Sequence, residues 1–258
     1  MPTQAAPAHA PRPALKPRPA ARAVRLVRPR NAVLLGDCVE VLSRLPAGCV
    51  DLVVTDPPYL VRYRPRDGRT VRGDDDDRWL RPASFAMHRA LKDGGLCLSF
   101  YGWTRADRFI AAWRAAGFRL VGHVVFRKRY ASSARFLRYE HEQAYLLAKG
   151  APALPARPIG DVIDWPGPTG NRLHPTQKPV ALLRPLVEAF SRPGDLVLDP
   201  FAGSGSTLVA ARRAGRDALG VEIDPAHHAT AARRLDALAA ALAPDAAPDA
   251  AEARRAAA

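Results

Sequence analysis

The chain has 258 residues, of which 48% are hydrophobic, and a formal net charge of +14 at pH 7. A chain of this length and composition can bury a sizeable core. We therefore expect it to fold without a stabilising metal ion or disulfide bonds. The three cysteines have no CxxC or Cys/His spacing, so we expect neither disulfides nor a metal site, and the surplus of basic side chains favours a polyanionic partner.

Both ends of the chain differ in composition from the middle. Residues 1–30 contain seven Lys and Arg side chains and no Asp or Glu, so they hold half of the net charge. They also contain seven prolines and lack a continuous apolar stretch, which argues against a signal peptide and a transmembrane helix. We expect a disordered basic tail over 1–30 and a flexible tail over 242–258, which is rich in Ala, Asp and Pro.

From residue 31 onwards, short apolar runs alternate with helical patterns. The runs predict strands over 32–36, 50–55, 95–101, 119–126, 142–148, 195–199 and 217–222. The helical patterns cover 38–45, 82–91, 103–116, 178–191, 206–214 and 226–241. This alternation is typical of an α/β domain with a mostly parallel, seven-stranded sheet flanked by helices, here over 31–241. Six prolines between 150 and 175 predict an irregular segment instead of another regular element.

One predicted strand ends in Asp-Pro-Pro-Tyr at residues 56–59. In open α/β sheets, ligands bind beyond the carboxyl ends of such strands. The two prolines remove backbone donors, which leaves the Asp56 carboxylate and the carbonyls of Asp56 and Pro57 as acceptors beside the Tyr59 ring. These groups suit a planar heterocycle whose amino group donates hydrogen bonds while its ring stacks on the tyrosine. The alternative is a proline-stiffened turn in which Asp56 caps the next segment.

A second strand, 195–199, leads into a glycine-rich turn that opens a helix near Ser206. Gly203 and Gly205 allow the backbone to approach a ligand closely. Nineteen residues after Gly203, Glu222 ends the next strand, where a carboxylate can accept hydrogen bonds from a ribose diol. This order of strand, turn, helix, strand and acid is typical of a nucleoside-cofactor half-site.

Two phosphate-binding forms of that half-site are disfavoured. A dinucleotide fingerprint needs a third glycine at position 208, which is Leu208 in this chain, and a Walker P-loop needs a lysine that does not follow Gly205. We therefore expect a nucleoside cofactor without phosphates, such as S-adenosylmethionine.

Together, these motifs resemble the amino-methyltransferases of DNA, which act on N6 of adenine or N4 of cytosine. The family's Asp-Pro-Pro-Tyr catalytic loop matches residues 56–59, and its Phe-x-Gly-x-Gly cofactor loop matches residues 201–205. The catalytic loop comes first, by about 145 residues, as in the permuted β group of the family. The resemblance covers nearly all of 31–241 and implies a Rossmann-like methyltransferase fold that uses S-adenosylmethionine.

Two further segments match the family. His174-Pro175-Thr176-Gln177-Lys178-Pro179 resembles the segment beside the methionine end of the cofactor, and Gly36-Asp37 resembles the strand-end acid that contacts its adenine. The alternative roles are a helix cap for Asp37 and a solvated charge for Lys178. His227 and His228 have no further ligands in sequence that would indicate a metal. The resemblance implies cofactor contacts from Asp37, Thr176, Lys178, Asp199, Phe201, Gly203, Gly205, Ser206 and Glu222.

The resemblance also implies a mechanism without a covalent enzyme intermediate. The base leaves the duplex, its amine is held by the catalytic loop, and it attacks the methyl group directly. The residues implied for this step are Asp56, Pro57, Pro58 and Tyr59. No cysteine nucleophile is needed, and no Pro-Cys pair occurs.

A basic segment with interleaved aromatic residues suggests where DNA binds. Basic side chains contact phosphates while aromatic rings stack on bases, although such runs are also common on solvated faces. The resemblance places target recognition within 127–172, a short interval that suggests a homodimer or a short target sequence. The charged loop 66–78 is a candidate lid. The candidate DNA contacts are Arg127, Lys128, Arg129, Arg135 and Arg138.

Adenine-N6 methylation of duplex DNA is the first choice, because cytosine-N4 enzymes more often have serine in place of the first Asp of the tetrapeptide. An RNA base methyltransferase is opposed by the order of the motifs, and a catalytically idle DNA-binding accessory protein is opposed by their completeness. The family further implies a cytoplasmic enzyme of bacterial, plasmid or phage origin, and leaves open whether its role is restriction-modification, regulation or mobile-element defence. No endonuclease motif is present, so no endonuclease partner is expected.

Overall fold

The computed structural model describes residues 29–61, 73–131, 136–155, 157–167 and 177–243. The predicted tails 1–30 and 242–258 therefore lie almost wholly outside the described residues. The strands are β1 (Ala32–Leu35), β2 (Val50–Thr55), β3 (Leu91–Phe100), β4 (Arg119–Arg127), β5 (His141–Ala148), β6 (Val162–Asp164), β7 (Leu196–Asp199) and β8 (Asp217–Glu222). The helices are α1 (Cys38–Ser43), α2 (Leu80–Ala90), α3 (Ala106–Ala116), α4 (Val180–Phe190), α5 (Ser206–Arg213) and α6 (Pro225–Ala241), with a short 3-10 turn at Trp103–Arg105.

All described strands form one sheet with the order β1-β8-β7-β2-β3-β5-β4-β6. Neighbouring strands are parallel except where β5 pairs with β3 and with β4, so the predicted mostly parallel α/β fold is confirmed. The described part of the sheet has eight strands, one more than predicted. The additional strand is β6, which pairs with the end of β4 at the edge of the sheet, inside the segment predicted to be irregular.

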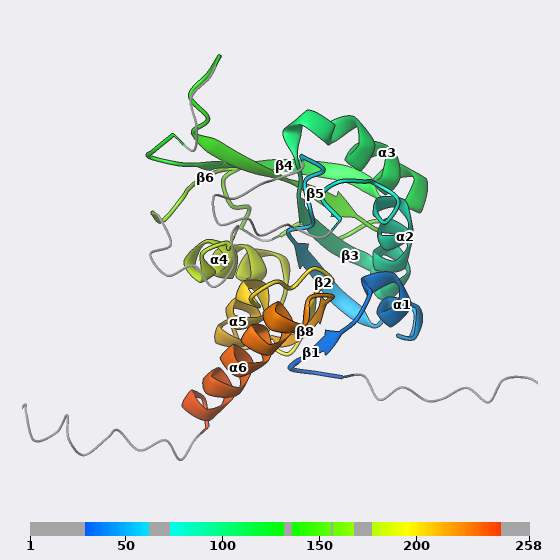
Figure 1. Ribbon diagram of the computed structural model, residues 1–258, viewed down its shortest axis with the longest axis vertical. Coiled ribbons are helices and arrows are strands. Elements are labelled where there is room, and N and C mark those ends of the chain that lie inside the picture. Colours follow the sequence, from blue (N-terminus) through cyan, green and yellow to red (C-terminus); the bar gives the residue numbers. More distant parts are fainter. Residues whose placement is uncertain (1–28, 62–72, 132–135, 156, 168–176, 244–258) are drawn as a thin grey trace, which may run out of the picture.

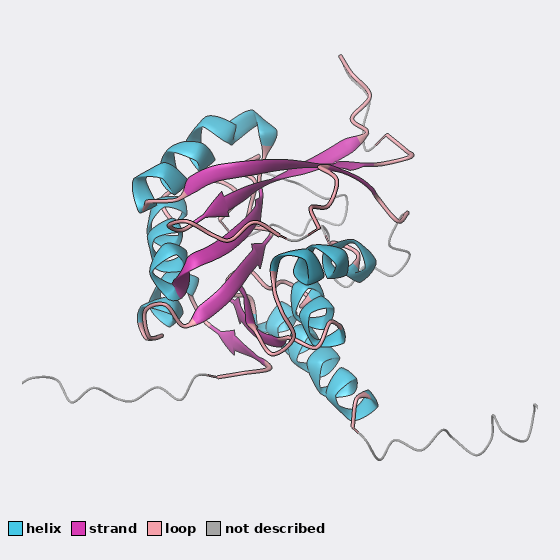
Figure 2. Ribbon diagram, turned by 180° about the vertical axis from the view of Figure 1, so that it is seen from behind, coloured by secondary structure: helices cyan, strands magenta, loops and turns pink. Residues whose placement is uncertain are grey.

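Helices cover both faces of the sheet (Figures 1 and 2). Side chains alternate along β2, so Val53 packs toward the helices α1, α2 and α3, whereas Leu52 and Val54 pack toward α4, α5 and α6. Each face has its own apolar core, and Trp113 and Leu186 are fully buried examples from the two sides. The three cysteine side chains are buried.

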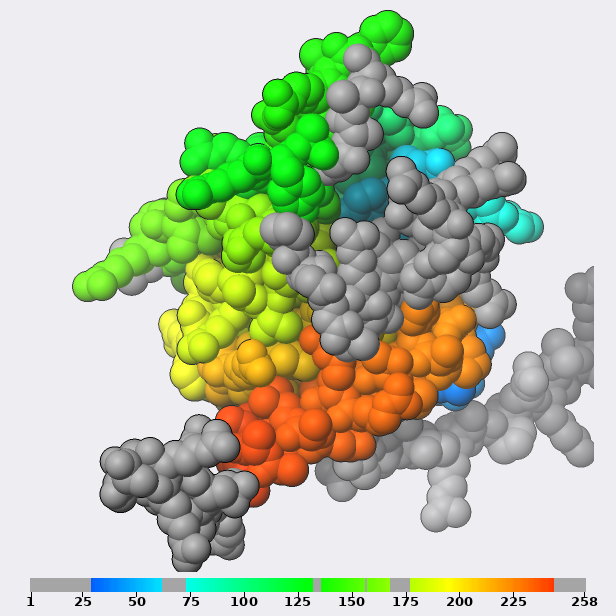
Figure 3. Space-filling view, turned by 60° about the vertical axis from the view of Figure 1, so that its left-hand side comes forward, coloured from blue at the N-terminus to red at the C-terminus, as the bar shows by residue number. Residues whose placement is uncertain are grey.

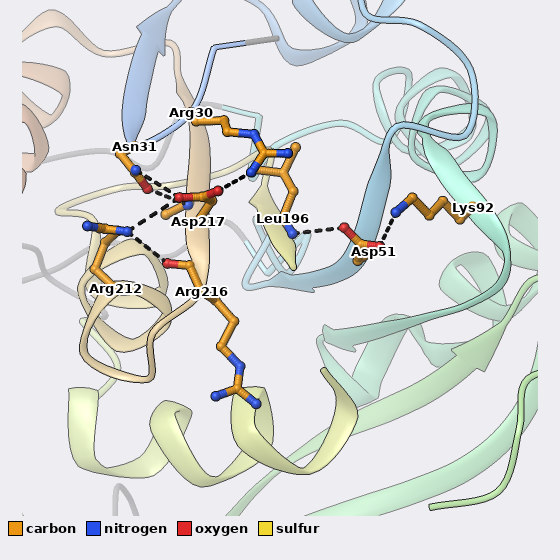
Figure 4. Close-up of polar contacts among 9 residues, drawn as sticks. Arg30, Asn31, Asp51, Lys92, Leu196, Arg212, Arg216 and Asp217 are labelled. Atoms are coloured by element: carbon orange, nitrogen blue, oxygen red, sulfur yellow. Dashed lines mark hydrogen bonds and ion pairs between the residues drawn. The ribbon is translucent and has the colours of Figure 1, made fainter. Parts of the chain in front are cut away.

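Polar contacts join the strands at their amino ends, opposite the edge where ligands bind in such sheets (Figure 4). Asp51 of β2 accepts a hydrogen bond from Leu196 N of β7 at 2.8 Å and forms an ion pair with Lys92. Asp217, at the start of β8, binds Arg30 and Arg212. The Asp51 contacts tie the start of β2 to β7 and β3, and the Asp217 contacts tie the start of β8 to the segment before β1 and to α5.

The order of the strands creates a switch point between β2 and β7. The chain leaves β2 toward β3 on one side and leaves β7 toward β8 on the other. Since adjacent parallel strands that diverge in this way leave a crevice at their carboxyl ends, a ligand site is expected there. The loops after Thr55 and Asp199 both start at that crevice.

Candidate active site at the switch point

A pocket of about 600 Å³ lies at the carboxyl ends of β2, β7 and β8. Its volume is in the range of sites for small molecules and cofactors. The predicted catalytic and cofactor loops meet in it, although about 145 residues separate them in sequence. The predicted site residues that line it are Asp37, Asp56, Pro57, Pro58, Tyr59, Lys178, Asp199, Phe201, Gly203, Ser206 and Glu222.

The glycine turn is built around the carboxylate of Glu222. One oxygen of Glu222 accepts a hydrogen bond from Gly203 N at 2.7 Å, and the other accepts one from Asp224 N at 2.8 Å. Gly205 has a left-handed backbone with φ of 81°, and a Cβ there would lie 3.0 Å from the Cβ of Ala231 in α6. The turn therefore requires glycine at 205 both for its backbone angle and for the space beside α6.

Arg234 of α6 supports the same turn and was not foreseen from the sequence. Its guanidinium donates to the Ser204 carbonyl at 2.5 Å and to the Ser206 hydroxyl at 3.3 Å. Burial lowers the pKa of Arg234. The sequence shows two adjacent arginines, Arg233 and Arg234, on this alanine-rich helix and does not indicate which of them turns inward.

Asp199 lies beneath both loops. It is buried, and its Oδ1 accepts hydrogen bonds from the Thr55 hydroxyl at 3.0 Å and from Phe201 N at 3.1 Å. Burial is the main cause that raises the pKa of Asp199 to about 7. Asp199 thus links the start of the catalytic loop to the start of the glycine turn.

Two other parts of the pocket come from segments with less regular structure. Asp37 caps α1 by accepting hydrogen bonds from Val39 N and Glu40 N, so its capping role coexists with its position in the pocket lining. Trp79 packs edge-on against Phe201 with ring centroids 5.0 Å apart. The described part of the candidate lid, residues 73–78, contributes Gly73, Asp74, Asp75, Asp76 and Arg78 to the pocket lining.

In the catalytic loop, Asp56 is held between a phenol and an ammonium group. Its Oδ1 accepts a hydrogen bond from Tyr59 Oη at 2.8 Å, and its Oδ2 accepts one from Lys178 Nζ at 2.6 Å. Burial raises the pKa of Asp56, and the Lys178 ammonium offsets part of that rise. The pKa of Tyr59 is also raised, by burial and by Asp56, so its hydroxyl keeps its proton and can donate.

Lys178 is only 6% exposed, so it is not the solvated charge considered as an alternative. Its Nζ lies 4.8 Å from the centre of the Phe100 ring and 3.0 Å from Glu142 Oε2. Glu142 in turn forms an ion pair with Lys128 at 2.5 Å. The two lysines lower the pKa of Glu142 to about 2, despite the opposing effect of burial, and its carboxylate is therefore ionised.

The candidate DNA contacts do not share one environment. Arg127, Arg129 and Arg138 are exposed, and two of them form ion pairs at the surface, Arg127 with Asp164 and Arg138 with Glu140. Lys128 is instead 9% exposed and turned inward to Glu142, so a phosphate contact from Lys128 is not supported. Arg135, Thr176 and His174 lie outside the described residues.

Replacing Gly102 with alanine is expected to lower activity without unfolding the protein. A Cβ at Gly102 would lie 2.4 Å from the carbonyl oxygen of Tyr59. Because this oxygen belongs to the backbone, the clash can be relieved only by a shift of the catalytic loop. A displacement of about 1 Å can reduce a rate about a hundredfold. Methyl-transfer kinetics and urea denaturation of Gly102→Ala measure the two effects. Equal kcat values for variant and wild type would show that the loop position is unimportant.

Neither a metal site nor a membrane-spanning helix is found in the part of the chain that the structure describes. No group of three or more His, Cys, Asp and Glu side chains is placed to hold a metal ion there. His228 instead makes a 3.1 Å hydrogen bond to the Val33 carbonyl. Among the described helices, none combines the length and apolar character needed to cross a membrane.

Comparison with known proteins decides the family. The model of N6/N4 methyltransferases, described as DNA methylase, matches residues 50–164 and 156–233, which include both loops. The chain belongs to the N6/N4 DNA methyltransferase family. YubD of Escherichia coli (strain K12), whose name gives it only as a methylase, is 53% identical over 214 residues, which are 83% of this chain and 94% of YubD.

Two more distant relatives extend the comparison. The DNA adenine methyltransferase YhdJ of Escherichia coli (strain K12) is 29% identical over 80% of this chain and 83% of its own length. The structure of a protein of Thermus thermophilus, described as a DNA modification methylase and complexed with S-adenosyl-L-methionine, has a TM-score of 0.63 and 27% identity. That match covers 80% of this chain and 93% of the other chain.

The cofactor of this methyltransferase is S-adenosylmethionine, which supplies an electrophilic methyl group, and its substrate is DNA. The pocket fits such a nucleoside. Gly203, which has a left-handed backbone, lines the pocket, whereas Gly205 faces α6 and does not, and the Glu222 carboxylate, with both oxygens oriented by backbone N–H groups, lies at the end of β8. The catalytic loop forms another part of the same pocket, so a bound nucleoside and a methyl acceptor can meet there.

Proposed function

We propose that this enzyme methylates N6 of adenine in duplex DNA and that Asp56 is its central catalytic residue. The observation that carries the proposal is the Asp56 carboxylate at the pocket, oriented by Tyr59 and Lys178. The aspartate in the first position of the tetrapeptide supports adenine over cytosine. The match to YhdJ, a DNA adenine methyltransferase, supports the same base.

The proposed mechanism depends on positioning. The exocyclic amine is a poor nucleophile because its lone pair is delocalised into the ring. Hydrogen bonds from the amine to Asp56 and to the Pro57 carbonyl would turn that lone pair toward the methyl group. Orientation of the bound reactants in this way can lower the activation barrier by several kcal/mol. The nitrogen–carbon bond forms as the carbon–sulfur bond breaks with its electron pair on sulfur. A proton then leaves the amine to water.

The residues around the β4–β5 connection are proposed to bind the duplex. This part of the chain, green in Figure 3, projects from the molecule. It carries the exposed Arg127, Arg129 and Arg138, and Phe136 is fully exposed. The arginines can contact phosphates, and Phe136 can occupy space that a flipped base leaves in the stack. Target recognition within 127–172 is part of this proposal.

The test is transfer of tritium from methyl-labelled S-adenosylmethionine to unmethylated duplex DNA, followed by analysis of the nucleosides. Label in N6-methyladenine is the expected result. Label in N4-methylcytosine would keep the family chemistry and overturn the choice of base. RNA of the same sequence serves as the second acceptor, and preferential labelling of RNA would contradict the proposed substrate.

A further inference from the structure

Glu142 is a carboxylate that the proposed chemistry does not use. It lies behind Lys178 and is not part of the pocket lining, whereas Lys178 and Asp56 are. Glu142 contacts two ammonium groups, one at 2.5 Å from Lys128 and one at 3.0 Å from Lys178. It reaches this place because β5 runs antiparallel to β3, which brings the start of β5 to the edge where β2 and β3 end.

Among the described residues, four charged side chains that contact one another at this edge form a balanced cluster. Asp56 and Glu142 contribute two negative charges, and Lys178 and Lys128 contribute two positive charges, so the sum is zero. Without Glu142, one carboxylate would face two largely buried ammonium groups. Charge balance matters here because unit charges a few ångströms apart interact strongly when water is excluded.

The reaction brings a third positive charge to this edge. S-adenosylmethionine has a sulfonium group, whereas its product, S-adenosylhomocysteine, has a neutral thioether. The methyl group has to reach an amine at Asp56, so the sulfonium has to approach the Asp56–Lys178 pair. A Lys178 ammonium without a balancing carboxylate would repel that sulfonium.

We propose that Glu142 is a specificity-determining counter-ion: by balancing the ammonium groups of Lys178 and Lys128, it allows the pocket to favour the cationic methyl donor over the neutral product. Lys178 can then hold Asp56 without opposing the cofactor. This inference rests on S-adenosylmethionine as the cofactor and is independent of which base is methylated.

The test measures the affinities of the full-length protein for S-adenosylmethionine and S-adenosylhomocysteine by titration calorimetry without DNA. Glu142→Gln keeps the size of the side chain and removes its charge. We expect this variant to bind the donor about tenfold more weakly and the product with less than a twofold change. A matched control is Glu188→Gln, which neutralises an exposed glutamate paired with Arg184 on α4 and should change neither affinity.

Two further variants separate charge from structure. Lys128→Met removes a positive charge from the same cluster, so it should raise the preference for the donor over the product. The double variant Glu142→Gln with Lys128→Met restores the sum of charges and should return the preference toward that of the wild type. Equal weakening of both ligands in Glu142→Gln, or a double variant no better than the single one, would overturn the proposal. Because no DNA is present, these outcomes are distinct from failure of the proposed adenine specificity.

Discussion

Asp56→Ala is expected to reduce kcat for methyl transfer about a hundredfold to a thousandfold, whereas S-adenosylmethionine should still bind, about tenfold more weakly because a negative charge near its sulfonium is lost. The reason is that the variant loses the acceptor proposed to orient the amine, and loss of one preorganised group at a reacting centre costs about 10²–10³ in rate. Lys178 keeps Glu142 as a partner, so the variant does not leave its ammonium unpaired. Single-turnover kinetics and calorimetry measure the two quantities.

Asp93→Ala is the matched control for that experiment. The Asp93 side chain is 91% exposed and pairs only loosely with Lys149, at 3.4 Å, on the surface. Its removal should leave both kcat and cofactor affinity unchanged. A kcat for Asp56→Ala within tenfold of the wild type would be incompatible with a central role for this carboxylate.

Lys178→Met should impair both the rate and the stability of the protein. It leaves Asp56 and Glu142 as neighbouring carboxylates, and Glu142 keeps only Lys128 as an ammonium partner. Removal of one member of a buried ion pair typically destabilises a protein by about 3–5 kcal/mol. Urea denaturation at neutral pH measures this loss, and Lys92→Met, at an exposed ion pair with Asp51, provides a control expected to lose about 1 kcal/mol or less.

The sign of the pH dependence follows from the same carboxylates. Lys178 lowers the pKa of Asp56 and of Glu142, so its removal raises both. Because the unfolded chains titrate alike, the stability deficit depends on the folded proteins: the folded variant binds more protons than the folded wild type, so the deficit should shrink as the pH falls and grow until the pH has risen through the raised pKa values of the folded variant. The acidic limb of kcat should move to higher pH. A profile that superimposes on that of the wild type would show that Lys178 does not control the ionisation of Asp56.

The fold could be predicted because most strands are apolar runs that turns interrupt. Val50–Thr55 and Leu196–Asp199 are almost wholly buried, so most of their residues are hydrophobic, and each run stops at an Asp-Pro pair. β6 could not be predicted in this way. It has three residues at the sheet edge, Val162 is more than half exposed, and its pairing with β4 depends on a strand over thirty residues away.

The site was predicted only where it follows local motifs. The sequence indicated Asp56, Lys178 and the glycine turn, and the structure brings them to one pocket; their individual roles stay predictions. Glu142 could not be predicted because it lies at the start of a strand, whereas ligand sites in parallel sheets lie at the ends of strands. Only the antiparallel pairing of β5 with β3 brings the start of β5 to the same edge. Lys128 was assigned to DNA because a basic run does not show which of its side chains turns inward.

The shared anchor at Asp199 implies thermodynamic coupling between the two halves of the reaction. Because Thr55 and Phe201 bind the same carboxylate oxygen, a shift of the glycine turn is transmitted to the segment that carries Asp56. Tightening of one half should therefore preorganise the other, so that cofactor raises the affinity for DNA. Linkage then requires that DNA raise the affinity for cofactor by the same factor. The enzyme would accordingly assemble its ternary complex cooperatively.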